Sequence, residues 1–533
     1  MGLQSWKNFS GPTVLLCINA FSGLGIFYEG YNQGVMGGVL SSPDAIRITD
    51  IGKDGVITNS TKDGGLVSIY YLGALVGCLW GGSISDKHGR KIAVFLGTFW
   101  GIIGTALLTA AQNTNWFLCA RLIAGVGAGH LINVVPCWAS ELAPSHTRGK
   151  SVCLLFLANY IGIAVAYWIA FGVSYVNGGQ GGFRWRFPIG FNLIPVLILS
   201  LTIWFFPESP RWLIKQDRHE EALEILQKLR EDSAKRDVTP QVAAEFGEIR
   251  RVIASETQHA TRDSLWAMPF GYQSGKLHYG RRVALAFCIQ IMMEWGGITA
   301  VVMYGPTVLA QAGWSAHKIG WISALNNTFG IAGTYLCALL IDRVGRRMML
   351  YVGSIGCAAS MFIAGGFAKL VQDHPENKTG YGIGCTVFLF LFTAFFSSTW
   401  LMVTWIYPTE IFPTSTRAKG NSFAVAGFAI GCAWTTLVNP IMFQRITYNT
   451  FWIFGSLNLI YPVLIWAFYP ETAKRTLETM DFLFASRSPF AWEEEKELEK
   501  LYTVFGDKLT MEAVEDDHHR AAKEKDVEVV SAE

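Results

Sequence analysis

The stretch Asp86-Lys-His-Gly-Arg-Lys91 decides the fold, because it recurs 256 residues later as Asp342-Arg-Val-Gly-Arg-Arg347. Two more pairs of stretches repeat in the same order, at offsets of 269 and 263 residues. They are Glu141-Leu-Ala-Pro-Ser-His-Thr-Arg148 with Glu410-Ile-Phe-Pro-Thr-Ser-Thr-Arg417, and Pro207-Glu-Ser-Pro-Arg211 with Pro470-Glu-Thr-Ala-Lys474. Self-similarity at a nearly constant offset marks a duplicated structural unit. The sequence therefore predicts a chain built from two related halves.

The composition is typical of a membrane protein. Of the 533 residues, 51% are hydrophobic and only 16% are charged, whereas soluble domains carry about 25% charged residues. The 43 basic residues nearly balance the 41 acidic ones, which argues against a nucleic-acid partner. The ten cysteines include no Cys-x-x-Cys pair, so we expect no disulfide framework, metal site or cofactor.

Twelve stretches are long and apolar enough to cross a bilayer, which takes about 20 residues in a helix. They are residues 14–40, 64–84, 92–111, 117–138, 151–175, 186–206, 282–311, 316–341, 348–371, 381–407, 419–442 and 449–469. We therefore expect an all-α membrane protein with two pseudo-symmetric six-helix bundles, residues 1–206 and 282–469. A cytoplasmic helical linker, 207–281, joins them, and a cytoplasmic tail, 470–533, ends in a disordered part.

Basic residues fix the expected orientation. They concentrate on alternate loops, for example at Lys87, Arg90 and Lys91, and the loops with this excess face the cytoplasm. We therefore expect a multi-pass protein of the plasma membrane with both termini cytoplasmic. Two sequons, at Asn59 and Asn377, then fall on outside loops and are candidate glycosylation sites.

The repeated motifs place acids and bases together on the cytoplasmic loops. Such charges can pair to hold the two halves closed on that side and separate as the halves move. The simpler alternative is that they only anchor the topology. The residues of this candidate cytoplasmic latch are Asp86, Arg90, Glu141, Arg148, Glu208, Arg211, Asp342, Arg346, Glu410, Arg417 and Glu471.

The same motifs, with those at Arg121-(x)3-Gly125-x-Gly127-x-Gly129 and Pro470-Glu-Thr-Ala-Lys-Arg-Thr-Leu-Glu478, resemble the signatures of the sugar porter family of the major facilitator superfamily. Tyr31-Asn-Gln-Gly-Val-Met-Gly37 is most similar to fungal monosaccharide transporters. The resemblance implies alternating-access transport of a neutral hexose or pentose by a monomeric unit in the lipid bilayer.

The resemblance also implies a sugar site near mid-membrane, although several positions depart from the family. Met293-Glu294 stands where the family has Gln-Gln, and Thr299 and Phe156 replace an Asn and a Gln. A carboxylate within a span is costly and therefore normally functional. The candidate sugar-binding residues are Phe156, Asn159, Gln290, Glu294, Thr299, Asn327, Trp400, Trp405 and Trp434. For each Trp, packing against lipid or core is the alternative.

Energy coupling stays open at this stage. Proton-coupled members of the family have Asp where this chain has Asn32, but Glu29 lies one turn earlier on the same helical face. Glu29 paired with Arg121 would form a displaced proton switch, which predicts symport with protons. The alternatives are a structural ion pair in a passive uniporter, and a non-transporting sugar sensor of the same fold.

Other classes fit poorly. Gly149-Lys150-Ser151 lacks the first glycine of a phosphate-binding loop, because Pro144 stands there, and no catalytic set of residues is evident. An anionic substrate such as quinate or galacturonate would lie unfavourably beside Glu294. We therefore expect a transporter of a small neutral sugar rather than an enzyme.

Overall fold

The computed structural model describes residues 5–53, 55–144, 148–230, 239–259, 268–270, 278–413, 416–473, 475, 480, 483–484 and 488–505. Within these ranges it has twelve helices long and apolar enough to cross a membrane, which confirms the predicted number. The distal tail that we expect to be disordered, Glu512 to Glu533, lies outside the described residues.

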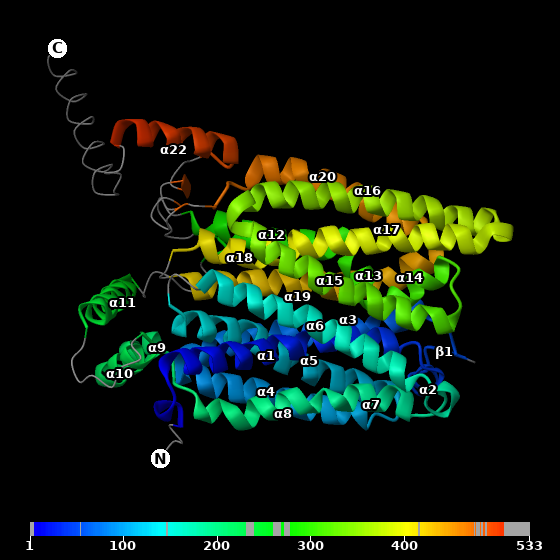
Figure 1. Cartoon of the computed structure of the whole chain (residues 1–533), viewed down its shortest axis with the longest axis horizontal. Coiled ribbons are helices and arrows are strands. Elements are labelled where there is room, and N and C mark those ends of the chain that lie inside the picture. Colours follow the sequence, from blue (N-terminus) through cyan, green and yellow to red (C-terminus); the bar gives the residue numbers. More distant parts are fainter. Residues whose placement is uncertain are drawn as a thin grey trace, which may run out of the picture.

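The first six spans run back and forth along the long axis of the molecule (Figure 1). Their helices are α1 (Gly11–Val39), α3 (Ser60–His88), α4 (Arg90–Thr109), α5 (Thr114–Leu142), α6 (Arg148–Val173), and α7 (Phe183–Phe191) followed by α8 (Leu193–Thr202) and η3 (Ile203–Phe205). Within this half α3 and α4 pack on α5, and α1 packs on α6.

The second half repeats this arrangement with two interrupted spans. Its helices are α12 (Tyr279–Met293), η5 (Glu294–Ile298), α13 (Thr299–Met303), α14 (Gly305–Gln311), α15 (Ala316–Val344), α16 (Arg346–Asp373), α17 (Lys378–Ser398), α18 (Trp400–Ile411), α19 (Arg417–Arg445) and α20 (Asn449–Phe468). The seventh span runs from α12 to α13, and the tenth runs through α17 and α18.

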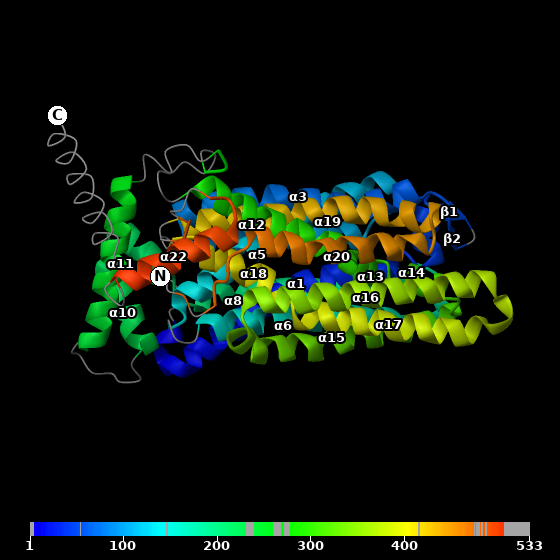
Figure 2. The same cartoon turned by 90° about the horizontal axis from the view of Figure 1, so that it is seen from above.

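Shorter elements gather at the two ends of the bundle (Figures 1 and 2). One end, here called the linker end, carries η1 (Ser5–Asn8), α9 (Pro210–Lys215), α10 (His219–Arg230), α11 (Pro240–His259) and α22 (Ala491–Phe505). The opposite end, here called the hairpin end, carries α2 (Pro43–Ile48) and the antiparallel strands β1 (Gly52–Lys53) and β2 (Val56–Ile57).

Glycines allow the helices to approach closely. A methyl group added at Gly129 of α5 would overlap the backbone of Ala74 in α3. Gly30 of α1 meets the Asn159 backbone in α6 in the same way. In a membrane, where lipid is as apolar as the helix surface, such close packing is the main source of helix association.

The two halves meet along α3 with α19 and along α6 with α15. Several hydrogen bonds cross between the described residues of the two halves. Among them, Ser68 donates to the Ala433 carbonyl at 2.7 Å, and Trp168 donates to Thr328 at 2.9 Å. The two halves therefore meet mainly through two helix pairs.

Replacing Gly129 with Ala should separate α3 from α5. We expect the variant to lose about 1–3 kcal/mol of unfolding free energy, the usual cost of overpacking. Gly65→Ala is the matched control on α3, because no heavy atom lies within 4 Å of its added methyl. Thermal unfolding in detergent measures both, and equal midpoints for the two variants would contradict the close-packing argument.

Candidate functional site

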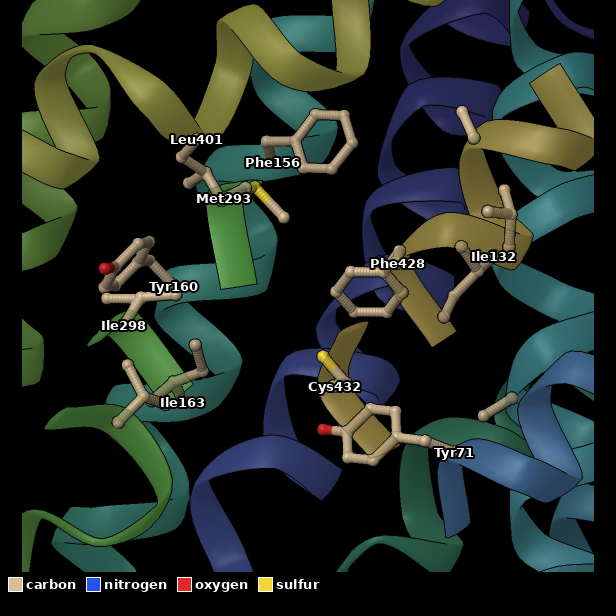
Figure 3. Packing of buried hydrophobic residues seen from close by; sticks show 14 of the residues in the cluster. Tyr71, Ile132, Phe156, Tyr160, Ile163, Met293, Ile298, Leu401, Phe428 and Cys432 are labelled. Carbon is tan, nitrogen blue, oxygen red and sulfur yellow. The ribbon is translucent and has the colours of Figure 1, made fainter. Parts of the chain in front are cut away.

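A cavity lies between the two halves, and the side chains around it come from both (Figure 3). The first half contributes α1, α5 and α6, and the second contributes the interrupted spans and α19. The lining residues are Ile26, Glu29, Gln33, Ile132, Pro136, Phe156, Asn159, Tyr160, Ile163, Met293, Glu294, Ile298, Thr299, Val302, Met303, Phe396, Leu401, Trp405, Phe428 and Cys432. Two of them are acids and none is basic.

The two helix interruptions lie beside this cavity. The π-helical turn η5 contains Gly297, whose φ of 105° is accessible to glycine but strained for other residues. Between α17 and α18, Thr399 has φ −134° and ψ −74°, outside the helical region. Single π-helical turns and broken membrane helices are frequent at binding sites. Glu294 is the first residue of η5, Trp405 lies in the helix that begins after Thr399, and both side chains line the cavity.

Five of the nine predicted sugar-binding residues line the cavity together: Phe156, Asn159, Glu294, Thr299 and Trp405. The rings of Phe156 and Trp405 stack at a centroid distance of 5.1 Å, and Trp405 also contacts Phe428 at 5.3 Å. Because Phe156 belongs to α6 and Trp405 to α18, this aromatic pair connects the two halves.

The other four lie outside the cavity lining. Trp400 is buried and donates to Ser354 at 3.2 Å, while Gln290 and Asn327 donate to backbone carbonyl oxygens at 3.1 and 2.9 Å. Trp434 is 53% exposed on the outer surface, where it stacks on Trp295. The rotation of α19 turns Cys432 toward the cavity and Trp434 away from it, so our expectation for Trp434 does not match the geometry.

Glu294 is held by hydroxyl groups. The Thr299 hydroxyl donates to its carboxylate at 2.6 Å, and the Thr435 hydroxyl donates to Thr299 at 3.1 Å. The Glu294 side chain is 4% exposed. Since the cavity lining contains no basic residue, the described cavity gives this carboxylate hydrogen-bond donors but no counter-charge.

Sequence reasoning missed several members of the site. Tyr160 presents a buried hydroxyl that has no hydrogen-bond partner among the described residues. Gln33 donates to Glu29 at 3.5 Å. Its position four residues after Glu29 could have predicted this contact, because residues four apart are neighbours on a helix. No sequence pattern predicts Tyr70 or Cys432 at the site, because each reaches it from a helix remote in sequence.

Glu29 and Arg121 are not in direct contact, which corrects the ion pair expected from the sequence. The Tyr70 hydroxyl donates to Glu29 at 2.6 Å, while the Arg121 guanidinium lies over the Tyr70 ring, 4.4 Å from its centroid. Arg121 donates to the carbonyls of Leu66 and Val67 at 3.4 and 3.3 Å. The Tyr70 ring therefore separates the two charges. Asn32 donates to the Tyr28 carbonyl at 2.9 Å.

At the linker end of the first half, Arg90 makes two hydrogen bonds of 2.9 Å to Glu141. Asp86 lies 3.5 Å from the same guanidinium. Glu208 accepts hydrogen bonds from the backbone N–H groups of Arg90 and Lys91 at 3.0 and 3.2 Å. These N–H groups open α4, where the helix dipole favours an anion. Burial nevertheless raises the pKa of Glu208 above its ordinary value.

The second half repeats this geometry. Arg346 binds Glu410 at 3.2 and 2.7 Å and Asp342 at 3.2 Å. Glu471 accepts from the N–H groups of Arg346 and Arg347, both at 3.0 Å, at the start of α16. The repeated sequence therefore produces a repeated charge network.

Both recorded networks join segments of one half, whereas we expected them to connect the two halves. Arg90 links α4 to α5, and Arg346 links α16 to α18. Arg211 belongs to α9, Arg417 opens α19, and the Arg148 side chain lies outside the described residues. The networks thus brace each half internally.

The sequons lie at the hairpin end. Asn59 caps α3 by accepting from the Lys62 N–H at 3.0 Å, and Asn377 ends the short helix η6 (Pro375–Asn377), in an exposed position. Glycosylation at both stays a prediction.

A family model described as sugar (and other) transporter matches residues 16–484. The sugar transporter STL1 of Saccharomyces cerevisiae is 30% identical over 482 residues, covering 88% of this chain and 81% of that protein. A quinate permease of Neurospora africana is 29% identical, covering 86% of each chain. The solved structure of XylE, described as a proton:xylose symporter, superposes with a TM-score of 0.73 at 22% identity, covering 89% of this chain and all of that one.

Removing one partner of the buried Arg90–Glu141 pair should destabilise the first half. Glu141→Ala leaves a buried guanidinium without its main acceptor, and we expect a loss of about 3–5 kcal/mol. Asp86→Ala is the control, since Asp86 is 41% exposed, and its loss should stay below about 1 kcal/mol. The apolar double variant Arg90→Met with Glu141→Leu should recover stability. Equal unfolding midpoints for Glu141→Ala and Asp86→Ala would contradict the bracing role.

Proposed function

The chain belongs to the sugar (and other) transporter family of the major facilitator superfamily, and on that premise we propose that it carries a neutral monosaccharide across the membrane by alternating access. It is a multi-pass membrane protein of a transporter family and not an enzyme. The observation that carries the proposal is the cavity between the halves, which combines an aromatic pair with polar side chains.

The chemistry of the cavity fits a hexose or a pentose. A sugar ring presents apolar C–H faces that pack on aromatic rings, and Trp405 with Phe156 offers such a surface. Its hydroxyls need donors and acceptors, and Asn159, Tyr160 and Thr299 supply them. Because buried polar groups left unpaired are costly, these side chains also favour a ligand rich in hydroxyls.

An anionic substrate fits less well, although some relatives are named quinate permeases. A carboxylate ligand would meet Glu29 and Glu294 in a cavity whose described lining holds no basic residue. Like charges at close range cost several kcal/mol in such an environment. We therefore favour an uncharged substrate.

In the orientation proposed here, the linker end faces the cytoplasm. The proposed location is the plasma membrane, and the proposed functional unit is a monomer. Support comes from the basic residues of both charge networks, which lie at that end and follow the positive-inside rule. Protease access to the linker 207–281 from the cytoplasmic side only would check this orientation.

Coupling to protons is proposed to run through Glu29. Its carboxylate borders the cavity and also receives the Tyr70 hydroxyl, whose ring covers Arg121. Protonation of Glu29 would weaken that hydrogen bond and allow the Tyr70 ring to move. Because this ring of α3 covers Arg121 of α5, the movement would alter the contact between α3 and α5. The relation to a structure described as a proton:xylose symporter is consistent with this route.

Trp405→Ala should impair transport by removing the aromatic face. We expect about a tenfold loss of apparent affinity for the best substrate, equivalent to about 1.4 kcal/mol. Trp434→Ala is the matched control, since that ring lies on the outer surface, and it should behave as wild type. The measurement is competition of labelled uptake by hexoses, pentoses, polyols and quinate in transporter-deficient cells. Uptake of no compound, with a signalling defect on deletion, would instead identify a sensor.

Glu29→Gln should uncouple transport without blocking it. Wild-type uptake should rise on acidification and collapse with a protonophore, whereas Glu29→Gln, which mimics the protonated acid, should still exchange sugar but no longer accumulate it. Asp50→Asn, at an exposed acid of the hairpin end, is the control. Sugar-induced alkalinisation of an unbuffered cell suspension decides the matter, and its absence at saturating sugar would make the protein a uniporter.

A further inference from the structure

Glu294 is the counterpart of Glu29 in the duplicated chain. The two acids are 265 residues apart, within the 256–269 residue range of the repeated motifs. Glu29 lies in the first span and Glu294 at the start of η5 in the seventh, which is the first span of the second half. Each half therefore carries one carboxylate in its first span, and both border the same cavity.

The surroundings of the two acids are similar. Each carboxylate accepts a hydrogen bond of 2.6 Å from a hydroxyl group, Tyr70 for Glu29 and Thr299 for Glu294. Both side chains are nearly inaccessible, at 3% and 4% exposure. Neither has a recorded ion pair, and Arg121 approaches Glu29 only from behind the Tyr70 ring.

Apart from Glu29 of α1, which borders the same cavity, the groups around Glu294 on neighbouring helices are neutral. They are the Cys432 thiol on α19, the Tyr71 hydroxyl on α3 and the Tyr160 hydroxyl on α6. Gln290, one helical turn before Glu294 on the same span, donates to the Thr404 carbonyl. Asn458 of α20 packs against Gly296. Among the described residues that line the cavity, none can neutralise Glu294.

An ionised carboxylate without a counter-charge is costly within a membrane span. A bound proton removes that cost, and an opening that admits water restores the conditions for ionisation. In a protein that opens its cavity to each side in turn, such a group takes up a proton on one side and releases it on the other.

We propose that Glu294 is a second proton-carrying group, so that the transporter moves two protons with each sugar. The inference rests on the proposed function and extends it from Glu29 to the second half of the chain. The proton passes from the outside solution to the Glu294 carboxylate while the cavity faces outward, and from the carboxylic acid to the inside solution after the halves have moved.

A proton fits the site better than a cationic group of the substrate. An ammonium group donates three hydrogen bonds and needs several acceptors. The lining next to Glu294 is formed by Met293, Ile298 and Cys432, and the Thr299 hydroxyl already donates to the carboxylate. These neighbours suit an uncharged carboxylic acid.

The test is the proton-to-sugar ratio, measured from the reversal potential of purified protein in liposomes with a pH gradient. We expect a ratio of two for the wild type and one for Glu294→Gln or Glu29→Gln. The double variant should show no coupled proton flux, and its thermal unfolding midpoint in detergent is measured beside that of the wild type to show that it is folded. Glu294→Asp should restore a ratio of two. Asp63→Asn, at a buried acid outside the cavity lining, is the matched control and should keep a ratio of two.

A wild-type ratio of one that Glu294→Gln leaves unchanged would overturn the inference while leaving the proposed symport through Glu29 intact. Sugar flux without any proton flux would overturn both coupling roles, and absence of sugar flux would overturn the proposed function itself. If an amino sugar such as glucosamine bound at least tenfold better than glucose, and Glu294→Gln removed that preference, the carboxylate would bind the substrate instead, which also overturns the inference.

Discussion

Glu208 and Glu471 each bind two successive backbone N–H groups at the start of a membrane-spanning helix, and the arrangement of each half depends on this contact. The first turn of a helix leaves N–H groups that need acceptors. Gly89 and Gly345, with φ of 97° and 94°, turn the chain sharply enough for a carboxylate from a remote segment to reach them. The neighbouring arginine then binds a second acid, so that three segments are fixed at one point.

Because each network closes within one half, it holds the helices of that half together without joining the two halves. The contact between the halves consists mainly of α3 against α19 and α6 against α15, and it includes hydrogen bonds such as those from Ser68 and Trp168. Regular helical geometry is interrupted in the two broken spans of the second half, at Gly297 and Thr399. A ligand that contacts Glu294 or Trp405 therefore touches the segments that contain or follow these breaks.

The sequence predicts what depends on composition and repetition. Hydropathy is enough to identify twelve spans, and the repeated motifs predict paired networks that the structure then shows inside each half. What it cannot predict is the rotation of individual helices. Trp434 and Cys432 are two residues apart, yet only Cys432 lines the cavity. Residue spacing also does not predict that the Tyr70 ring lies between Glu29 and Arg121. Such contacts depend on how helices pack, which one-dimensional periodicity does not contain.

The stacked pair of Trp295 and Trp434 has an optical consequence. Trp295 belongs to η5, the π-helical turn that carries Glu294, whereas Trp434 belongs to α19, and their rings lie 6.3 Å apart at an angle of 5°. Two indoles in this arrangement couple their electronic transitions, and the coupling falls off steeply with distance and tilt. Any rearrangement of the broken seventh span relative to α19 therefore alters the near-ultraviolet circular dichroism of the unlabelled protein. The near-ultraviolet signal of these two tryptophans therefore reports the position of η5 relative to α19 without an added label.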